Sequence, residues 1–334
     1  MERLTARLLP LFSLLFILVF TTQSLAATSE KAWSDPQKAE QEVPDFSIQG
    51  EYKVSTRWVK MAAQVVALGD GKFKVVGLNG LPGEVSRLDN KMVLEMGTEN
   101  GRVGGTSKTV KVIKGDSVPR GSTIWIENDT IKVSAGLMKL NFKKVERKSP
   151  TLNAKAPEVA VVLFDGTSAD KFEGGKMTDD GLMEVGCRSK QKFKSHKMHL
   201  EFRTPFMPKS EVGERGNGGL SVQGLYEIQI LDTFGKETTN GASGQIEKIA
   251  APKVNACLPP LQWQTYDIDF TAAVFEDGKK VQNARITVLL NGVKIHDDVE
   301  LPGVSAQASP EGGPIVLQQH GTPVRFRNIW VVPK

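Results

Sequence analysis

The 334-residue sequence has little cysteine or histidine and few stretches with the periodicity of a helix. Its two cysteines and four histidines form no Cys-x-x-Cys or His-Glu-x-x-His motif, so nothing supports a transition-metal centre. It has no Walker loop and no Gly-x-Gly-x-x-Gly opening a helix, and residues 219–223 lack a glycine of the nucleophile elbow. No cofactor is predicted. A Ca²⁺ site leaves no firm signature outside the EF-hand, and nothing in the sequence supports one.

The charges of the chain do not indicate a nucleic-acid partner. The 43 Lys and Arg residues against 38 Asp and Glu give a formal charge of +5, but the basic residues are spread out. No basic run alternates with aromatic residues, so we predict no binding to nucleic acid and at most a mild affinity for anionic surfaces. The cysteines, Cys187 and Cys257, would be able to pair in an oxidising compartment or to stay as two separate buried thiols.

The first 26 residues have the pattern of a secretory signal peptide. Arg3 and Arg7 precede an apolar run from Leu8 to Phe20, and Ser24-Leu25-Ala26 is a cleavage site with small residues at both ends. An uncleaved membrane anchor is the alternative, but the apolar run is rather short for a span. We therefore expect a secreted or periplasmic protein with no membrane span after cleavage. The first cysteine is Cys187, so no lipid-modified N-terminal cysteine is predicted.

Short strand-like runs separated by turn signals predict an all-β protein. We expect a linker over residues 27–46, a small antiparallel barrel or sandwich over 47–147, a second linker over 148–158 and a two-sheet jelly roll over 159–334. No helix is predicted after the signal peptide. Asn291-Gly292 between two apolar runs predicts a type I′ hairpin. The strands predicted in the first region are Lys60–Leu68, Lys72–Leu78, Lys91–Met96, Thr109–Lys114, Ser122–Glu127, Thr130–Ser134 and Met138–Phe142.

Two short segments, His199–Arg203 and Tyr226–Asp232, alternate strictly between apolar and polar residues. This is the period of a strand whose two faces lie in different environments. The polar positions carry cations, carboxylates, an imidazole and an amide, which suit a polyhydroxylated ligand. The simpler interpretation is a solvated face with cross-strand ion pairs. The polar residues of the two segments are His199, Glu201, Arg203, Glu227 and Gln229.

Other polar and aromatic residues are candidates for the same site. A loop before the second segment carries Arg215 and Asn217, and Gln318 and His320 share one face of a strand near the C-terminus. Trp263 offers a flat surface for a sugar ring, although a tryptophan in a β-sandwich is usually in the core or at the rim. Asp232 has the opposite strand parity from Glu227, so it ranks lower unless the alternation breaks at the strand end.

Taken together, the ordered motifs of residues 161–333 resemble the 3-keto-disaccharide hydrolase domain, a concanavalin A-like jelly roll of secreted bacterial proteins. The motifs that carry the resemblance are Leu163–Thr167, His199–Arg203, Arg215–Asn217, Tyr226–Asp232, Pro259–Ile268, Asn291–Val293, Leu317–Gly321 and Arg327–Ile329.

The resemblance implies cleavage of 3-keto-glycosides. A ketone at carbon 3 acidifies the hydrogen on carbon 2, so a carboxylate can remove that proton, the glycosidic oxygen leaves and water adds back. Such a scheme needs a base, an acid and donors for the enolate oxygen. On this basis Glu227 is assigned as base and His199 or His320 as acid, with Arg203 and Arg215 stabilising the enolate.

The remaining candidates are expected to bind substrate or to orient these groups. Gln229, Gln318 and Asn217 would hold hydroxyls, and Glu201 would orient Arg203 or His199. A non-catalytic glycan-binding module on the same fold is the leading alternative, because a fold does not decide a function. A third interpretation is a structural surface protein whose N-terminal β region is the functional part.

Overall fold

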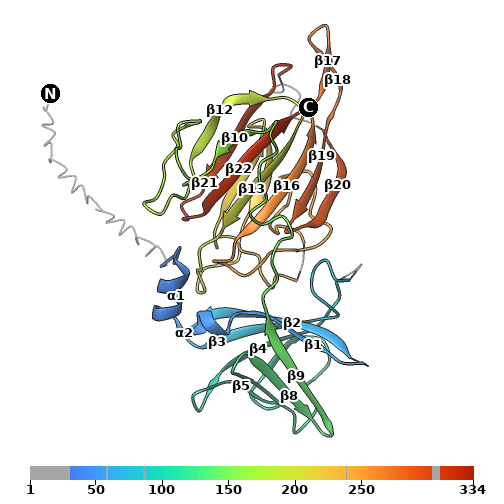
Figure 1. The fold of residues 1–334 in the computed structure, drawn as a ribbon. Helices are drawn as coiled ribbons and strands as arrows, with labels where there is room; N and C mark the ends of the chain where they lie inside the picture. The colour runs from blue at the N-terminus through green and yellow to red at the C-terminus, as the bar shows by residue number, and fades with distance from the viewer. Residues whose placement is uncertain (1–30, 58, 86–87, 238, 303–308) are drawn as a thin grey trace, which may run out of the picture. The chain divides into compact units, whose positions relative to one another are not determined.

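The computed structural model describes residues 31–57, 59–85, 88–237, 239–302 and 309–334. The predicted signal peptide, residues 1–26, and the start of the predicted first linker lie outside the described residues. No helix in the described part of the chain has the length and apolar character needed to cross a membrane. Residues 31–334 form one compact unit built mainly from antiparallel strands (Figure 1).

The N-terminal strands close into a barrel, which confirms the prediction of a small antiparallel β region. Within the described residues the order is β3-β2-β1-β9-β8-β7-β5-β4, pairing of β3 with β4 closes the barrel, and β6 is added beside β4. The strands are β1 (Gly50–Ser55), β2 (Lys60–Gly69), β3 (Lys72–Leu78), β4 (Asn90–Glu99), β5 (Arg102–Thr106), β6 (Lys111–Lys114), β7 (Thr123–Glu127), β8 (Thr130–Ala135) and β9 (Met138–Val145).

Strands β1 and β5 were not predicted. Strand β5 contains Gly104 and Gly105, and glycine is depleted in strands. Gly104 is nevertheless required, because its φ is +134° and an added Cβ would lie 2.1 Å from the carbonyl oxygen of Ile124. The backbones of β5 and β7 approach closely at this glycine, so β5 lacks the alternating side-chain pattern from which an ordinary strand is predicted.

Two short helices in the described residues correct the prediction that none follows the signal peptide: α1 (Pro36–Glu42) and α2 (Pro44–Ile48). Both begin at a proline, which suits the first helical turn because that position needs no backbone donor. Asp35 caps α1 by accepting a hydrogen bond from the backbone N–H of Gln37 at 2.8 Å. The helices are too short for their periodicity to be visible in the sequence.

The C-terminal half contains two antiparallel sheets, as predicted for a two-sheet sandwich. Among the described residues, the six-stranded sheet has the order β10-β22-β13-β16-β19-β20, and the five-stranded sheet has the order β11-β12-β21-β14-β15 (Figure 1). The first comprises β10 (Val161–Phe164), β22 (Arg325–Pro333), β13 (His196–Arg203), β16 (Gln264–Thr271), β19 (Ala284–Leu290) and β20 (Val293–Leu301). The second comprises β11 (Phe172–Glu173), β12 (Cys187–Phe193), β21 (Gly313–Gln319), β14 (Gly218–Val222) and β15 (Tyr226–Ile230). A separate hairpin is formed by β17 (Val274–Glu276) and β18 (Lys279–Gln282).

Apolar residues from both sheets form one core. Leu200 and Phe202 of the six-stranded sheet and Ile228 and Ile230 of the five-stranded sheet are fully buried in the same cluster. The predicted hairpin between β19 and β20 is also present, with positive φ at both Asn291 (53°) and Gly292 (76°). These are the signs that a type I′ turn requires.

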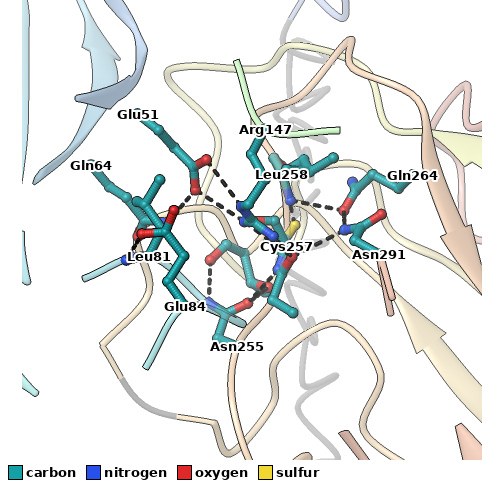
Figure 2. Close-up of polar contacts among 12 residues, drawn as sticks. Glu51, Gln64, Leu81, Glu84, Arg147, Asn255, Cys257, Leu258, Gln264 and Asn291 are labelled. Atoms are coloured by element: carbon teal, nitrogen blue, oxygen red, sulfur yellow. Dashed lines mark hydrogen bonds and ion pairs between the residues drawn. The ribbon is translucent and has the colours of Figure 1, made fainter. Parts of the chain in front are cut away.

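A buried ion pair lies at the end of the barrel, and its guanidinium also contacts a loop of the C-terminal half (Figure 2). The guanidinium of Arg147 donates to both carboxylate oxygens of Glu51 at 3.0 and 3.1 Å, and the Glu51 side chain is only 1% exposed. The same guanidinium lies 3.4 Å from the carbonyl oxygens of Ala256 and Cys257. Gln64 donates to Glu51 as well, so the carboxylate is satisfied from two directions.

Both cysteines are free and buried, so the structure has the separate thiols and not the disulfide. Burial raises the pKa of each thiol to about 12.

We expect Arg147→Ala to lower the free energy of unfolding by about 3 kcal/mol, because it leaves the buried Glu51 carboxylate without its cation. Chemical denaturation of the full chain measures the loss. The matched control is Lys132→Ala, which removes a cation from an exposed pair with Glu127 and is expected to cost less than about 1 kcal/mol. Equal losses in the two variants would contradict the special role of the buried pair.

Candidate functional site

The two alternating segments that were predicted to share one pocket lie in different sheets. Residues 199–203 belong to β13 of the six-stranded sheet, and residues 226–230 belong to β15 of the five-stranded sheet. Each strand points its apolar side chains into the common core, so the polar side chains face outward on opposite sides of the sandwich. The prediction of a single site containing His199, Glu201, Arg203, Glu227 and Gln229 is therefore wrong.

The outer face of the six-stranded sheet is covered by the connector that follows the barrel. Ser149 lies 2.7 Å from the hydroxyl of Thr265, and Thr151 donates to Asp267 at 2.6 Å. The backbone N–H of Asn153 donates to Glu201 at 2.5 Å. Residues 148–158 were predicted as a linker, and residues 149–154 of it are hydrogen-bonded onto this sheet.

His199 and Glu201 are both fully buried under this connector. Nδ1 of His199 is 2.6 Å from Asp267, and its ring stacks on Trp330 with centroids 5.1 Å apart. Glu201 accepts hydrogen bonds from Arg327 at 2.7 Å and from Asn328 at 3.0 Å. A proton donor for a glycosidic oxygen must reach its substrate, so the geometry does not support His199 as the catalytic acid.

The carboxylates and the imidazole of this network stabilise each other's charged forms. Burial alone would raise the pKa of Glu201, but the imidazole of His199 at 3.6 Å and hydrogen bonds from Asn328 and Arg327 outweigh it and hold the pKa at about 2. Burial disfavours the imidazolium of His199, yet the hydrogen bond to Asp267 and the Glu201 carboxylate 3.6 Å away raise its pKa above the usual value. The network of charged residues holds the connector on the sheet through hydrogen bonds.

Arg203 and Trp263, predicted for the site, also belong to this covered side. Arg203 donates to the carbonyl oxygen of Ser34 at 2.9 Å. Two guanidinium groups lie over the Trp263 ring, that of Arg203 at 4.9 Å and that of Arg327 at 4.1 Å from the ring centroid. These two cations already use the π-surface of the indole, so Trp263 serves the arginines of the covered side and is not a free platform for a sugar ring.

Arg215 and Asp232 are buried in the loops next to the five-stranded sheet and do not line its outer face. The Arg215 guanidinium donates to the carbonyl oxygens of Ser210 at 2.8 Å and Pro208 at 3.3 Å. Asp232 accepts from the backbone N–H of Phe234 at 3.1 Å, and burial raises its pKa to about 6. These contacts fold the loops, so enolate stabilisation by Arg215 and substrate binding by Asp232 are not supported.

The outer face of the five-stranded sheet keeps the other predicted residues together. Glu227 and Gln229 on β15 alternate with fully buried core residues and are themselves half-buried. The Gln229 amide can donate to Oε1 of Glu227 at 3.2 Å, and it lies 3.3 Å from the side-chain oxygen of Asn217. Gln318 on β21 donates to the hydroxyl of Ser221 at 3.0 Å.

Gly219 on β14 allows the Glu227 carboxylate and the Gln318 amide to converge. It pairs with Gln229 on one side and with Gln318 on the other. A Cβ added there would lie 2.3 Å from Oε1 of Gln318 and 2.8 Å from Oε1 of Glu227. Both oxygens therefore occupy the space that a side chain at position 219 would fill. A Cβ on the preceding Gly218 would instead point toward the core, 3.3 Å from Val324.

Glu227 and Gln318 line a pocket of about 540 Å³. Glu227, Gln318 and His320 lie on its wall, and Nε2 of the exposed His320 is 3.2 Å from Oε1 of Gln318. A carboxylate, an amide and an imidazole therefore face one solvent-accessible cavity. Asn217 does not line it, and its backbone carbonyl oxygen accepts a hydrogen bond from the hydroxyl of Thr322 at 2.7 Å.

Several polar residues of this face were not predicted, among them Glu173, Arg188 and Ser221. Arg188 and Glu173 line the pocket and form an exposed ion pair at 2.6 Å. Both come from strands whose side chains alternate, but neither segment carries a distinctive motif. Their positions depend on strand pairing over long range, because Glu173 pairs with Arg188 and Arg188 pairs with Val316 of β21. Within the described residues, no group of His, Cys, Asp or Glu is arranged to hold a metal ion.

The chain belongs to the family of the 3-keto-alpha-glucoside-1,2-lyase-like domain, whose model matches residues 159–332. This family is named for carbohydrate chemistry, and the match spans both sheets.

Three solved structures from Parabacteroides distasonis, all provisionally named glycosyl hydrolases, are similar to this half. One is 33% identical with a TM-score of 0.48, covering 54% of this chain and 85% of its own. Another is 22% identical with a TM-score of 0.38, covering 52% and 99%. The third is 15% identical with a TM-score of 0.38, covering 55% and 99%. No curated protein matches the chain.

His199 should stabilise the fold most at low pH. Its pKa is raised in the folded protein, so the contribution is complete below the unfolded value and is lost as pH rises through the folded value. We expect the difference in free energy of unfolding between wild type and His199→Gln to be larger near pH ~6 than near pH ~9.

The control is His196→Gln. Burial lowers the pKa of His196, so the corresponding difference should change in the opposite direction with pH. Parallel profiles for the two variants would contradict the assignment of His199 to a charged network.

Proposed function

We propose that the protein is a secreted carbohydrate-active enzyme that cleaves 3-keto-glycosides in the pocket on the five-stranded sheet. The observation that carries the proposal is the convergence over Gly219 of the Glu227 carboxylate and the Gln318 amide, with His320 on the same amide. The family of the domain supports the choice of a keto-sugar as substrate.

Glu227 is the proposed base. In the reaction the C2–H bond breaks, its electrons form the enolate with the carbonyl at carbon 3, and the proton passes to the carboxylate. Expulsion of the oxygen on carbon 1 then gives an unsaturated ketone, to which water adds to complete net hydrolysis. The half-buried position of Glu227 gives the carboxylate contact with both the pocket and its partner Gln229.

His320 is the proposed acid for the departing oxygen, in place of the buried His199. Its imidazole is exposed and lies beside Gln318, so it can approach a bound ligand. Gln318 and Gln229 supply amide groups for hydroxyls or for the enolate oxygen. Arg188 lines the pocket and is proposed to stabilise the negative charge of the enolate. The family resemblance had implied this role for Arg203 and Arg215.

Glu227→Gln is expected to lower turnover of 3-keto-trehalose or 3-keto-sucrose by roughly 10²–10⁴-fold, the range for loss of a positioned base. Release of free sugar from the mature protein measures the activity. Glu247→Gln, which alters an exposed carboxylate on the segment beside β15, is the control and should remain active. Full turnover by Glu227→Gln would remove this residue from the base role, and binding without turnover by wild type would favour a glycan-binding module.

Gly219→Ala tests the convergence without removing a functional group. The added Cβ must displace the Gln318 or Glu227 side chain, so we expect turnover to fall on the order of a hundredfold with the protein still folded. Gly218→Ala adds the same methyl group toward Val324 and should lower turnover much less. Equal effects of the two variants would contradict a reaction centred over Gly219.

A further inference from the structure

A separate cavity of about 490 Å³ lies where the barrel meets the loops of the C-terminal half. Its volume is in the range of pockets that hold small organic ligands, about 300–1,000 Å³. Gln64 of β2 lies on its barrel wall, and Asn255, in the loop before β16, lies on the wall from the sandwich (Figure 2). The cavity therefore takes its lining from both halves of the chain.

The buried ion pair of the barrel holds these two walls together. Gln64 donates to the Glu51 carboxylate at 3.1 Å. Arg147, bonded to the same carboxylate, lies 3.4 Å from the carbonyl oxygen of Ala256, the neighbour of Asn255. Because the walls are fixed before a ligand arrives, binding would cost little ordering of the protein.

One cation of the wall, Lys236, has a position built by the surrounding loop. The side-chain amide of Asn255 donates to the carbonyl oxygen of Lys236 at 3.2 Å. The Lys236 ammonium donates to the carbonyl oxygens of Asn240 at 2.5 Å and Gly241 at 2.9 Å. A Cβ on Gly241, whose φ is +64°, would lie 3.0 Å from the ammonium nitrogen, so glycine permits this approach. An ammonium has three N–H donors, and these two bonds leave one for a ligand.

Cations outnumber carboxylates on the wall of this cavity. The lysines are Lys114 of β6, Lys236, Lys253 and Lys294 of β20, and the carboxylates are Asp89 and Glu237. Lys253 is exposed, and no ion pair joins it to a carboxylate of the described residues. Lys114 and Lys294 belong to exposed pairs, at 3.7 and 2.9 Å, which stabilise the protein little. An anionic ligand would therefore meet an excess of positive charge.

The rest of the lining suits a carbon skeleton with hydroxyl groups. Val254 and Val293 are partly exposed and give apolar surface beside the lysines. The amide of Gln64 and the hydroxyl of Thr239 line the same cavity, and such neutral groups form hydrogen bonds with hydroxyls. A bare inorganic anion would leave the apolar surface uncovered, whereas a sugar that carries anionic groups would use all three kinds of lining.

We propose that this cavity binds an acidic saccharide, a sugar that carries at least two oxyanion groups, either carboxylates or phosphates. Lysine ammonium groups are compact charges that accept both kinds of oxyanion, so the two share one recognition chemistry. The proposal does not rest on the keto-sugar reaction, because the cavity and the pocket around Glu227 have no lining residue in common.

The test is calorimetric titration of the mature protein with digalacturonate and with fructose 1,6-bisphosphate, which separate the carboxylate source from the phosphate source. Maltose is the neutral sugar, and pyrophosphate is the anion without a sugar. We expect at least one acidic sugar to bind about tenfold or more tightly than maltose, and more tightly than pyrophosphate. Its affinity should fall as salt is raised from ~20 to ~200 mM, because the charges of the wall are accessible to screening.

Substitutions on both walls locate the binding site. Lys253→Ala on the sandwich wall and Lys114→Ala on the barrel wall should each weaken binding of that sugar severalfold, up to about tenfold. Asp89→Asn removes a negative charge from the same wall and should tighten binding, a change that damage to the fold would not produce. Lys192→Ala, which removes an exposed cation of β12 outside the cavity, is the matched control and should bind like wild type.

Affinities for both acidic sugars that are no higher than that for maltose overturn the proposal. Pyrophosphate that binds as tightly as the sugars overturns it too, because charge alone would then suffice. Binding that is lost in Arg188→Ala but kept in both lysine variants locates the anion in the pocket of the five-stranded sheet and also overturns it. These titrations measure no turnover, so their failure is distinct from failure of the proposed function.

Discussion

The burial of one apolar face of each sheet against the other determines where every functional group of the C-terminal half can lie. Met198, Leu200 and Phe202 enter the core from one side, and Tyr226 and Ile228 enter it from the other. Since side chains alternate along a strand, the polar neighbours of these residues are directed away from each other. The molecule therefore has two polar faces, and they cannot cooperate in one reaction.

The two faces differ in what covers them. On the six-stranded sheet, carboxylates and hydroxyls are used to hold the connector in place, and Glu201 and His199 have no exposed surface. On the five-stranded sheet, Glu227 and Gln318, which converge over Gly219, line an accessible pocket. A buried, mutually neutralised network stabilises the fold, whereas a carboxylate that keeps contact with an open pocket can meet a substrate.

The sequence was sufficient to predict most strands of the barrel and the direction of the side chains in the two alternating segments. Strands β2, β3 and β7 have nearly the predicted bounds, the Asn291-Gly292 hairpin is present, and Glu227 and Gln229 point outward. Alternation could not tell which sheet each strand joins, because strand pairing is decided by contacts far apart in the chain. That is why His199 and Arg203 were grouped with Glu227. Asp232 is buried and does not line the pocket. Its odd spacing from Glu227 along the strand was enough to predict that the two side chains point in different directions.

The connector between the barrel and the sandwich has a consequence for motion. A segment of polar residues and prolines would ordinarily behave as a flexible tether, whose ends explore a range of distances. Here Ser149, Thr151 and Asn153 are each bonded to the sheet below, and Arg147 is held by a buried carboxylate just before them. Such a segment has almost no slack. The connector therefore restricts movement of the barrel relative to the sandwich. A ligand of the barrel would have to bind it in this fixed position.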